Sequence, residues 1–151
     1  MRPELHGTDV AQSPGSGWAL VFACWLIATA SSLGALFLSE VMGIAPCVLC
    51  WYQRICMFPL VFILAAGLLP YDRRIVRYAL PLALAGWLIA LFHLLLAAGV
   101  IPESARPCTQ GVPCAEEQIV WFGFVTIPML SLLAFSSVVA LLIFTHFKDS
   151  K

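Results

Sequence analysis

The chain has 151 residues, of which 62% are hydrophobic and only 11% are charged, and its mean hydropathy is +0.96. An ordinary soluble domain carries about 25% charged residues and, at this length, leaves roughly 30% of its surface in water. So much apolar surface argues against a soluble enzyme and against a disordered tail. Eight basic residues balance eight acidic ones, so no net charge attracts nucleic acid. The composition therefore predicts a chain that lies mostly in lipid.

Four segments are long and apolar enough to cross a bilayer, which takes about 20 residues in a helix. Backbone groups in lipid must be hydrogen-bonded within the protein, and these segments lack the alternating pattern of barrel strands. We therefore expect an all-α integral membrane protein, a four-transmembrane-helix bundle formed by residues 18–147. The predicted helices cover about residues 18–38, 51–69, 78–101 and 119–144.

The basic residues predict the orientation of this bundle, because they concentrate in cytoplasmic segments. Six of them share one side of the predicted membrane: Arg2, Arg73, Arg74, Arg77, Lys148 and Lys151. The connections on the other side contain Arg106, and Arg54 lies at the start of the second helix. We expect both termini to be cytoplasmic, with residues 1–17 as a flexible leader and 148–151 as a short tail. Residues 39–50 and 102–118 should face outward.

The first helix could instead be a cleaved signal peptide, since Ala28-Thr29-Ala30 has the small residues of a cleavage site. The leader, however, pairs Arg2 with the acidic Glu4 and Asp9 and so lacks a positive n-region. The apolar run also continues to Leu38. These features favour an uncleaved transmembrane helix.

The cysteines fall into two groups. Cys24 and Cys56 lie within predicted helices, where we expect them to act as small apolar packing residues. The other four lie in the segments predicted to face outward: Cys47, Cys50, Cys108 and Cys114. Disulfides form and persist outside the cytoplasm. The topology and the cysteine positions thus agree, although each was inferred separately.

Cys47 and Cys50 form a CxxC motif, in which one thiol is readily ionised to the thiolate that carries out disulfide exchange. Cys50 lies near a helix N-terminus and four residues before Arg54, and both features predict a thiolate at Cys50. The alternatives are a structural disulfide or half of a metal site. Arg54 could also extend to the interface, beside Trp51 and Tyr52 in an aromatic belt.

The second pair, Cys108 and Cys114, lies in a short loop in which each cysteine follows a proline and Gly111 permits a reversal. Two pairs that face the same side suggest a relay of disulfide exchange. The alternative is a zinc site with four cysteines. Because the spacing departs from paired C-x₂-C patterns, we predict no metal.

His93 is an ionisable group deep in the third predicted helix, and such groups are candidates for function. It would lie in the outer half of that helix, level with the start of the second. There it could hydrogen-bond a quinone oxygen or carry a proton. The alternative is a neutral imidazole bonded to a neighbouring helix.

The sequence from Pro46 to Arg54, PCVLCWYQR, resembles the signature of the disulfide bond formation protein B (DsbB) family of quinone-linked membrane thiol oxidases. Downstream, VPC at 112–114 and WFGFVTIP at 121–128 are similar to its compact-loop, BdbC-like branch. The resemblance runs from about Ser31 to Phe144 and so covers all four helices. It implies an enzyme of a bacterial inner membrane, with the redox cysteines on the outer, periplasmic face.

The resemblance also implies roles for individual residues. A thioredoxin-like dithiol outside the cytoplasm would attack the disulfide Cys108–Cys114, with Cys108 forming the mixed disulfide. Electrons would pass to Cys47–Cys50 and then to ubiquinone or menaquinone, with Cys50 next to the quinone. Arg54 matches an arginine associated with quinone binding, and His93 matches a histidine of the third helix more loosely.

Two departures from the better-known branch stand out: the short gap between the loop cysteines, and Gln53, where that branch often has an acid. The sequence as a whole predicts a quinone-dependent thiol oxidase that supports disulfide formation in exported proteins. One alternative is a quinone reductase resembling vitamin K epoxide reductase, in which the CxxC normally follows the loop cysteines. The others are a non-catalytic scaffold with two structural disulfides and a metal carrier.

Overall fold

The computed structural model describes residues 15–101 and 126–149, and its long elements in these ranges are all helices. A short π-helical segment, η1, follows the first of them. The elements are α1 (Gly15–Leu36), η1 (Phe37–Val41), α2 (Val48–Leu68), α3 (Ile75–Ala97) and α4 (Ile127–Asp149). Each of the four α-helices is long and apolar enough to cross a membrane. The predicted fold class, an all-α membrane protein with four transmembrane helices, is confirmed.

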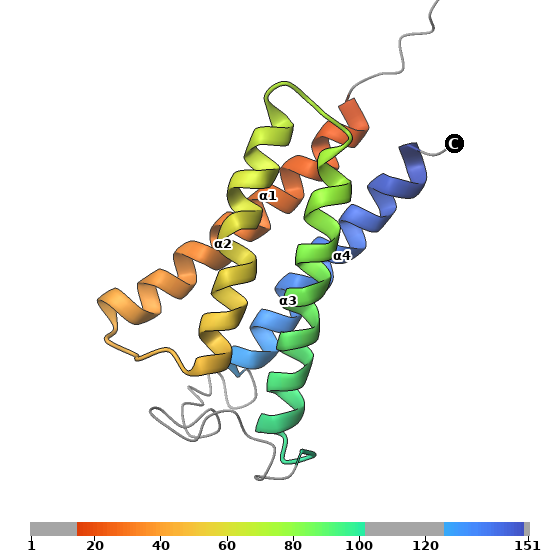
Figure 1. Cartoon of the computed structure of the whole chain (residues 1–151). Helices are drawn as coiled ribbons and strands as arrows, with labels where there is room; N and C mark the ends of the chain where they lie inside the picture. The colour runs from red at the N-terminus through yellow and green to blue at the C-terminus, as the bar shows by residue number, and fades with distance from the viewer. Residues whose placement is uncertain (1–14, 102–125, 150–151) are drawn as a thin grey trace, which may run out of the picture.

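The four helices alternate in direction along the bundle (Figure 1). Contacts join α1 to α2, α2 to α3, α3 to α4, and α4 back to α1. The N-terminal end of α1, the α2–α3 connection and the C-terminal end of α4 lie at one end of the bundle. The start of α2, the end of α3 and the start of α4 lie at the other end. The arginine-rich link thus shares an end with both terminal helix ends, and its assignment to the cytoplasm stays a prediction.

The helix starts differ from those expected from the apolar runs. α2 begins at Val48, three residues early, because Cys47 caps its N-terminus. α3 begins at Ile75 rather than 78, so its first turn includes Arg77. Thr126 lies outside any helix and α4 begins at Ile127, whereas residues 119–125 of the predicted fourth helix fall outside the described ranges. A helix can therefore start before the hydrocarbon begins, since polar side chains reach water from its first turn.

The helix ends also have local causes. α3 stops at Ala97, before the predicted 101, because Gly99 adopts the left-handed conformation with φ of 73°. Its N–H bonds to Leu96 O, and the N–H of Val100 bonds to Leu95 O, which closes the last turn. α4 continues to Asp149, past the predicted 144, through a last turn that contains the basic residue Lys148. A cation at this position is favoured by the helix dipole.

The core between the helices is apolar and closely packed. Phe135 of α4 is 1% exposed, and its ring lies directly against the backbone of α3 at Gly86. Cys24 and Cys56 both belong to the same buried cluster, as expected of packing residues. Cys24 Sγ also lies 3.9 Å from Val138 O of α4. Close approach of α3 and α4 therefore depends on the absence of a side chain at position 86.

We expect Gly86→Ala to destabilise the bundle, because the added Cβ would overlap the ring of Phe135. Overpacking of this kind costs about 1–3 kcal/mol. Thermal unfolding in detergent, followed by circular dichroism, measures the effect. Gly34→Ala is the matched control, since no neighbouring heavy atom lies within 4 Å of a Cβ built there. Equal melting temperatures for the two variants would contradict this account of the α3–α4 contact.

A candidate redox site at the start of α2

The cysteine pair lies where the chain enters α2. Cys47 is the N-cap residue, with extended backbone angles of φ −68° and ψ 169°, and it is 4% exposed. Its sulfur accepts a hydrogen bond from the backbone N–H of Cys50 at 3.3 Å. The first N–H groups of a helix have no partner within the helix, and a capping side chain supplies one. Here a sulfur atom takes the place usually filled by the oxygen of serine or aspartate.

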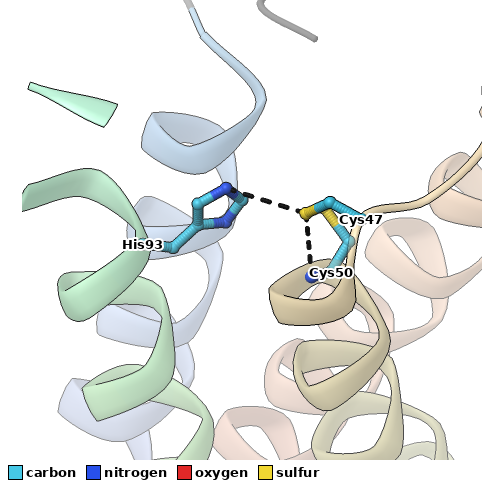
Figure 2. Close-up of side chains that lie close together, drawn as sticks. All are labelled: Cys47, Cys50 and His93. Carbon is cyan, nitrogen blue, oxygen red and sulfur yellow. Dashed lines mark hydrogen bonds between the residues drawn. The ribbon is translucent and has the colours of Figure 1, made fainter. Parts of the chain in front are cut away.

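The two sulfurs face each other (Figure 2). Cys50 Sγ lies 2.8 Å from Cys47 Sγ, within hydrogen-bond distance, and both thiols are free in this structure. A disulfide bond is about 2.05 Å long, so the pair can close with a movement of less than about 1 Å. Cys50 is the more accessible of the two, being only partly buried. The local geometry thus suits reversible oxidation.

These hydrogen bonds lower the pKa of Cys47. The main cause is the bond donated by the Cys50 thiol, which favours the thiolate; burial opposes it, and the nearby His93 and the Cys50 N–H support it. The sequence had suggested that Cys50 would be the thiolate. The structure gives the anion's position to Cys47 instead, because the Cys50 thiol favours a thiolate at Cys47 and the N–H of Cys50 donates to the same sulfur.

His93 comes to this pair from α3, as its predicted level in the membrane implied (Figure 2). The ring is 2% exposed, and its Nε2 lies 3.9 Å from Cys47 Sγ. The other ring nitrogen, Nδ1, lies 3.1 Å from the side-chain nitrogen of Gln53. His93 therefore joins the redox pair to a polar residue on the same helix as the cysteines.

Cys47, Cys50 and His93 also have the donor atoms of a metal site, since these atoms all lie within 4.8 Å of one another. Two thiolates and an imidazole would suit zinc or another soft ion. Such binding would require both thiols to be reduced and would compete with their oxidation. The expected absence of a metal stays a prediction.

Arg54 points from α2 to α1. Its Nη2 donates a hydrogen bond of 2.7 Å to Ala35 O, in the last turn of α1, just before η1. The guanidinium carbon lies 5.5 Å from the centre of the Trp51 ring, a cation–π contact. Ser39 Oγ donates to the same carbonyl at 3.2 Å. The half-buried Arg54 thus connects the start of α2, near Cys50, to the end of α1, where the π-helical segment η1 begins.

A cavity of about 390 Å³ lies beside the cysteines, between α1, η1, α2 and α4, with His93 of α3 in its wall. Its wall is mostly apolar, and both cysteines contribute to it. The polar side chains in the wall are Ser31, Ser32, Gln53, Arg54 and Ser131. The hydroxyl of Ser32 is buried and has no hydrogen-bond partner among the described residues. Size and lining are typical of a site for a small, mainly apolar ligand with a few polar groups.

The structure brings together Cys47, Cys50, Arg54 and His93, which were singled out from the sequence. Cys108 and Cys114 lie outside the described residues, so their predicted role stays a prediction. Sequence reasoning missed Ser131 and the part played by Gln53. The available signal was polar residues within two strongly apolar helices, with Gln53 three residues after Cys50.

Comparison with known proteins places this chain among disulfide-forming proteins. The family described as "Disulfide bond formation protein DsbB" matches residues 17–145. A "Probable disulfide formation protein" of Metapseudomonas resinovorans is 48% identical over 133 residues, covering 87% of this chain and 92% of the relative. "Disulfide bond formation protein C" of Bacillus subtilis is 44% identical over 115 residues, covering 76% of this chain and 83% of the relative. No solved structure gave a match.

The lowered pKa predicts that Cys47 remains reactive in mild acid. In the reduced protein, alkylation of Cys47 by iodoacetamide should continue at pH 6, where an ordinary thiol with a pKa of about 8.5 is less than about 1% ionised. Mass spectrometry of the alkylated peptide identifies the modified cysteine and gives its rate at each pH.

The matched variants are Cys50→Ser and Cys50→Ala. Serine retains a hydrogen-bond donor near Cys47 Sγ, whereas alanine removes it and should move the alkylation midpoint of Cys47 to higher pH. If both variants leave the midpoint of Cys47 near 8.5, the capping geometry does not stabilise its thiolate.

Proposed function

Since this chain belongs to the DsbB family of disulfide bond formation proteins, we propose that it oxidises a thioredoxin-like dithiol outside the cytoplasm and passes the electrons to a membrane quinone. Family membership establishes the coarser statement: it is a multi-pass membrane protein and a disulfide-forming oxidoreductase. The thiol partner, the quinone and the outward orientation of the cysteines are our proposal.

One observation carries the proposal: the two cysteines stand at the N-terminus of a membrane helix and, at the same time, in the wall of an apolar cavity. A protein dithiol arrives from water, whereas a quinone with a lipophilic tail arrives through the bilayer. The start of a membrane helix is where these two phases meet. The position of Cys47 and Cys50 thus supports electron exchange with both.

The exchange steps balance as two successive transfers of a disulfide. A thiolate of the partner attacks Cys108, which breaks the Cys108–Cys114 bond; the partner's second thiol then closes its own disulfide and leaves both loop cysteines reduced. The loop dithiol next reduces the Cys47–Cys50 disulfide in the same way. Each transfer moves two electrons, and the loop disulfide is restored by the second.

The cavity residues fit a quinone, which has an apolar ring and two carbonyl oxygens that accept hydrogen bonds. Arg54 would supply a charged donor and Ser32 its unpartnered hydroxyl, while the apolar wall would receive the ring. A bound quinone would supply the acceptor for the two electrons and the one proton released when the Cys47 thiolate and the Cys50 thiol close their disulfide. Cys50, being more accessible than Cys47, is our choice for the residue next to it.

The family match favours this mechanism over the vitamin K epoxide reductase alternative. The order of the cysteines supports the same conclusion, since the CxxC precedes the loop pair. A scaffold with inert disulfides would not exchange quickly with a partner dithiol, so a kinetic assay tests it directly.

The test is quinone consumption by purified protein in detergent with a reduced thioredoxin-like dithiol protein and a soluble quinone, followed by absorbance. Cys50→Ala should abolish consumption with any reductant. Cys108→Ala should abolish it with the protein dithiol but retain it with dithiothreitol, a small dithiol that reaches Cys47–Cys50 directly.

Wild-type protein that consumes no quinone with either reductant would overturn the proposal in favour of the scaffold. Cys50→Ala at the wild-type rate would instead show that Cys50 is not the quinone-facing thiol. Cys24→Ala is the matched control, because this cysteine is buried in the core and lies outside the cavity wall.

We expect Arg54→Ala to raise the KM for quinone by about tenfold, which corresponds to the loss of one charge-assisted hydrogen bond of about 1.5 kcal/mol. The kcat with saturating quinone should change less. Steady-state kinetics at several quinone concentrations separate the two constants. Arg77→Ala, at the opposite end of the bundle, controls for the loss of a positive charge. An unchanged KM would leave Arg54 only its contacts with Ala35 O and the Trp51 ring.

A further inference from the structure

Gln53 lies at the centre of a chain of polar contacts that crosses three helices. It is 7% exposed, which is unusual for an uncharged amide in a membrane helix unless its hydrogen bonds are made. Ser131 of α4 donates to Gln53 Oε1 at 2.6 Å, and Gln53 Nε2 lies 3.1 Å from His93 Nδ1 of α3. His93 Nε2 in turn lies 3.9 Å from Cys47 Sγ. The chain thus ends at the redox pair.

The distances favour one orientation of the Gln53 amide. The hydroxyl of Ser131 donates to Gln53 Oε1 at 2.6 Å, a length typical of an O–H···O bond. The group that faces Ser131 is therefore the amide oxygen. The amide nitrogen must then face His93, and an amide nitrogen can only donate.

This orientation determines which ring nitrogen carries the proton. Because Gln53 Nε2 donates, His93 Nδ1 must accept and so carries no hydrogen. The proton of a neutral imidazole then resides on Nε2, the nitrogen that faces Cys47 Sγ. A proton on Nδ1 would set two N–H donors against each other.

We propose that Gln53 is a positioning residue that holds His93 as the neutral imidazole with its proton on Nε2, directed at the sulfur of Cys47. The part played in turnover rests on the proposed function, whereas the proton position is a property of the resting protein. Ser131 acts one step further away, by orienting the Gln53 amide.

The other polar side chains near His93 do not set its proton position. The titratable side chains in the cavity wall are Cys47, Cys50, Arg54 and His93, and no carboxylate is among the described residues that line it. Arg54 directs its Nη2 to Ala35 O of α1. From α4 the partner is the uncharged Ser131. The proton on His93 is thus set by hydrogen bonding rather than by a neighbouring charge.

The tautomer of His93 decides whether the ring stabilises or destabilises a thiolate at Cys47. An Nε2–H stabilises the Cys47 thiolate that forms when the disulfide is reduced, whereas the other tautomer would present a lone pair to that sulfur. Oxidation of a Cys47 thiolate and a Cys50 thiol to the disulfide releases two electrons and one proton. Neutral His93 donates a hydrogen bond throughout, so the proton that leaves comes from Cys50.

Nitrogen-15 NMR of histidine-labelled, reduced full-length protein in detergent tests the proposal without partner or quinone. The chain has three histidines, and the signals that disappear in His93→Gln belong to His93. We expect a protonated Nε2 and an unprotonated Nδ1 at pH 7. A protonated Nδ1, a mixture of tautomers or an imidazolium would overturn the proposal. This measurement needs no variant of Gln53 to fold.

Two substitutions then test whether Gln53 is the cause. Gln53→Glu keeps the shape but offers only acceptors when ionised, so Nδ1 should gain a proton and both ring nitrogens should read as protonated. Gln53→Met removes the donor, and the single tautomer should be lost. Ser137→Ala is the matched control, since this α4 serine bonds to Leu133 O within its own helix. A wild-type spectrum for Gln53→Met would assign the tautomer to another group.

The same samples separate this inference from the proposed function. Failure to consume quinone, with the expected tautomer present, overturns the oxidase proposal and leaves the role of Gln53 in the resting site intact. Quinone consumption with the wrong tautomer overturns the role of Gln53 and leaves the oxidase proposal intact.

Discussion

The site depends on one contact, the hydrogen bond from the backbone N–H of Cys50 to the sulfur of Cys47. A sulfur at the N-cap is fixed by the helix that it starts, so its position follows from the position of α2 in the bundle. The same bond favours the thiolate over the thiol, because it is donated to the atom that carries the charge. It also holds the two sulfurs near each other, with Cys50 one turn into α2. Placement and pairing therefore share one cause, and this bond adds to the stabilisation of the thiolate that comes mainly from the Cys50 thiol.

A second feature of the site is the change from α-helix to π-helix where α1 ends, because residues on both sides of this change line the cavity. η1 follows α1 with π-helical geometry, which is often found at functional sites. Arg54 Nη2 donates a hydrogen bond to Ala35 O just before this change, and so connects the start of α2 to α1. In Figure 1 α1 and α4 run obliquely to α2 and α3. The cavity lies near the start of α2, and the two cysteines stand in its wall.

The sequence was sufficient for those features that arise from local chemistry. Charge-free apolar runs predicted four helices, and the cysteine spacing predicted a pair at the start of the second. The helix limits were less accurate, because the capping by Cys47 and the left-handed Gly99 outweigh hydropathy within a turn. The thiolate was expected at Cys50, since a count of residues shows nearness to Arg54 but cannot show that Arg54 points at Ala35 O. Ser131 could not be assigned, because its contact with Gln53 joins residues 78 positions apart.

Stabilising the Cys47 thiolate changes the reduction potential of the Cys47–Cys50 pair, and this limits how strongly the thiolate can be stabilised. Any group that favours the thiolate favours the reduced pair, and so makes the Cys47–Cys50 disulfide a stronger oxidant. The same stabilisation makes the pair a weaker reductant of its acceptor; for a two-electron couple about 1.4 kcal/mol corresponds to 30 mV. The proposed relay between a loop disulfide and a quinone needs a Cys47–Cys50 reduction potential between those of the loop disulfide and the quinone. A neutral imidazole stabilises the thiolate only moderately, since it donates a hydrogen bond without adding a full positive charge. An imidazolium at the same position would hold the thiolate more tightly and slow its return to the disulfide. An amide at position 53, rather than a carboxylate, is what keeps His93 in the weaker of these two roles.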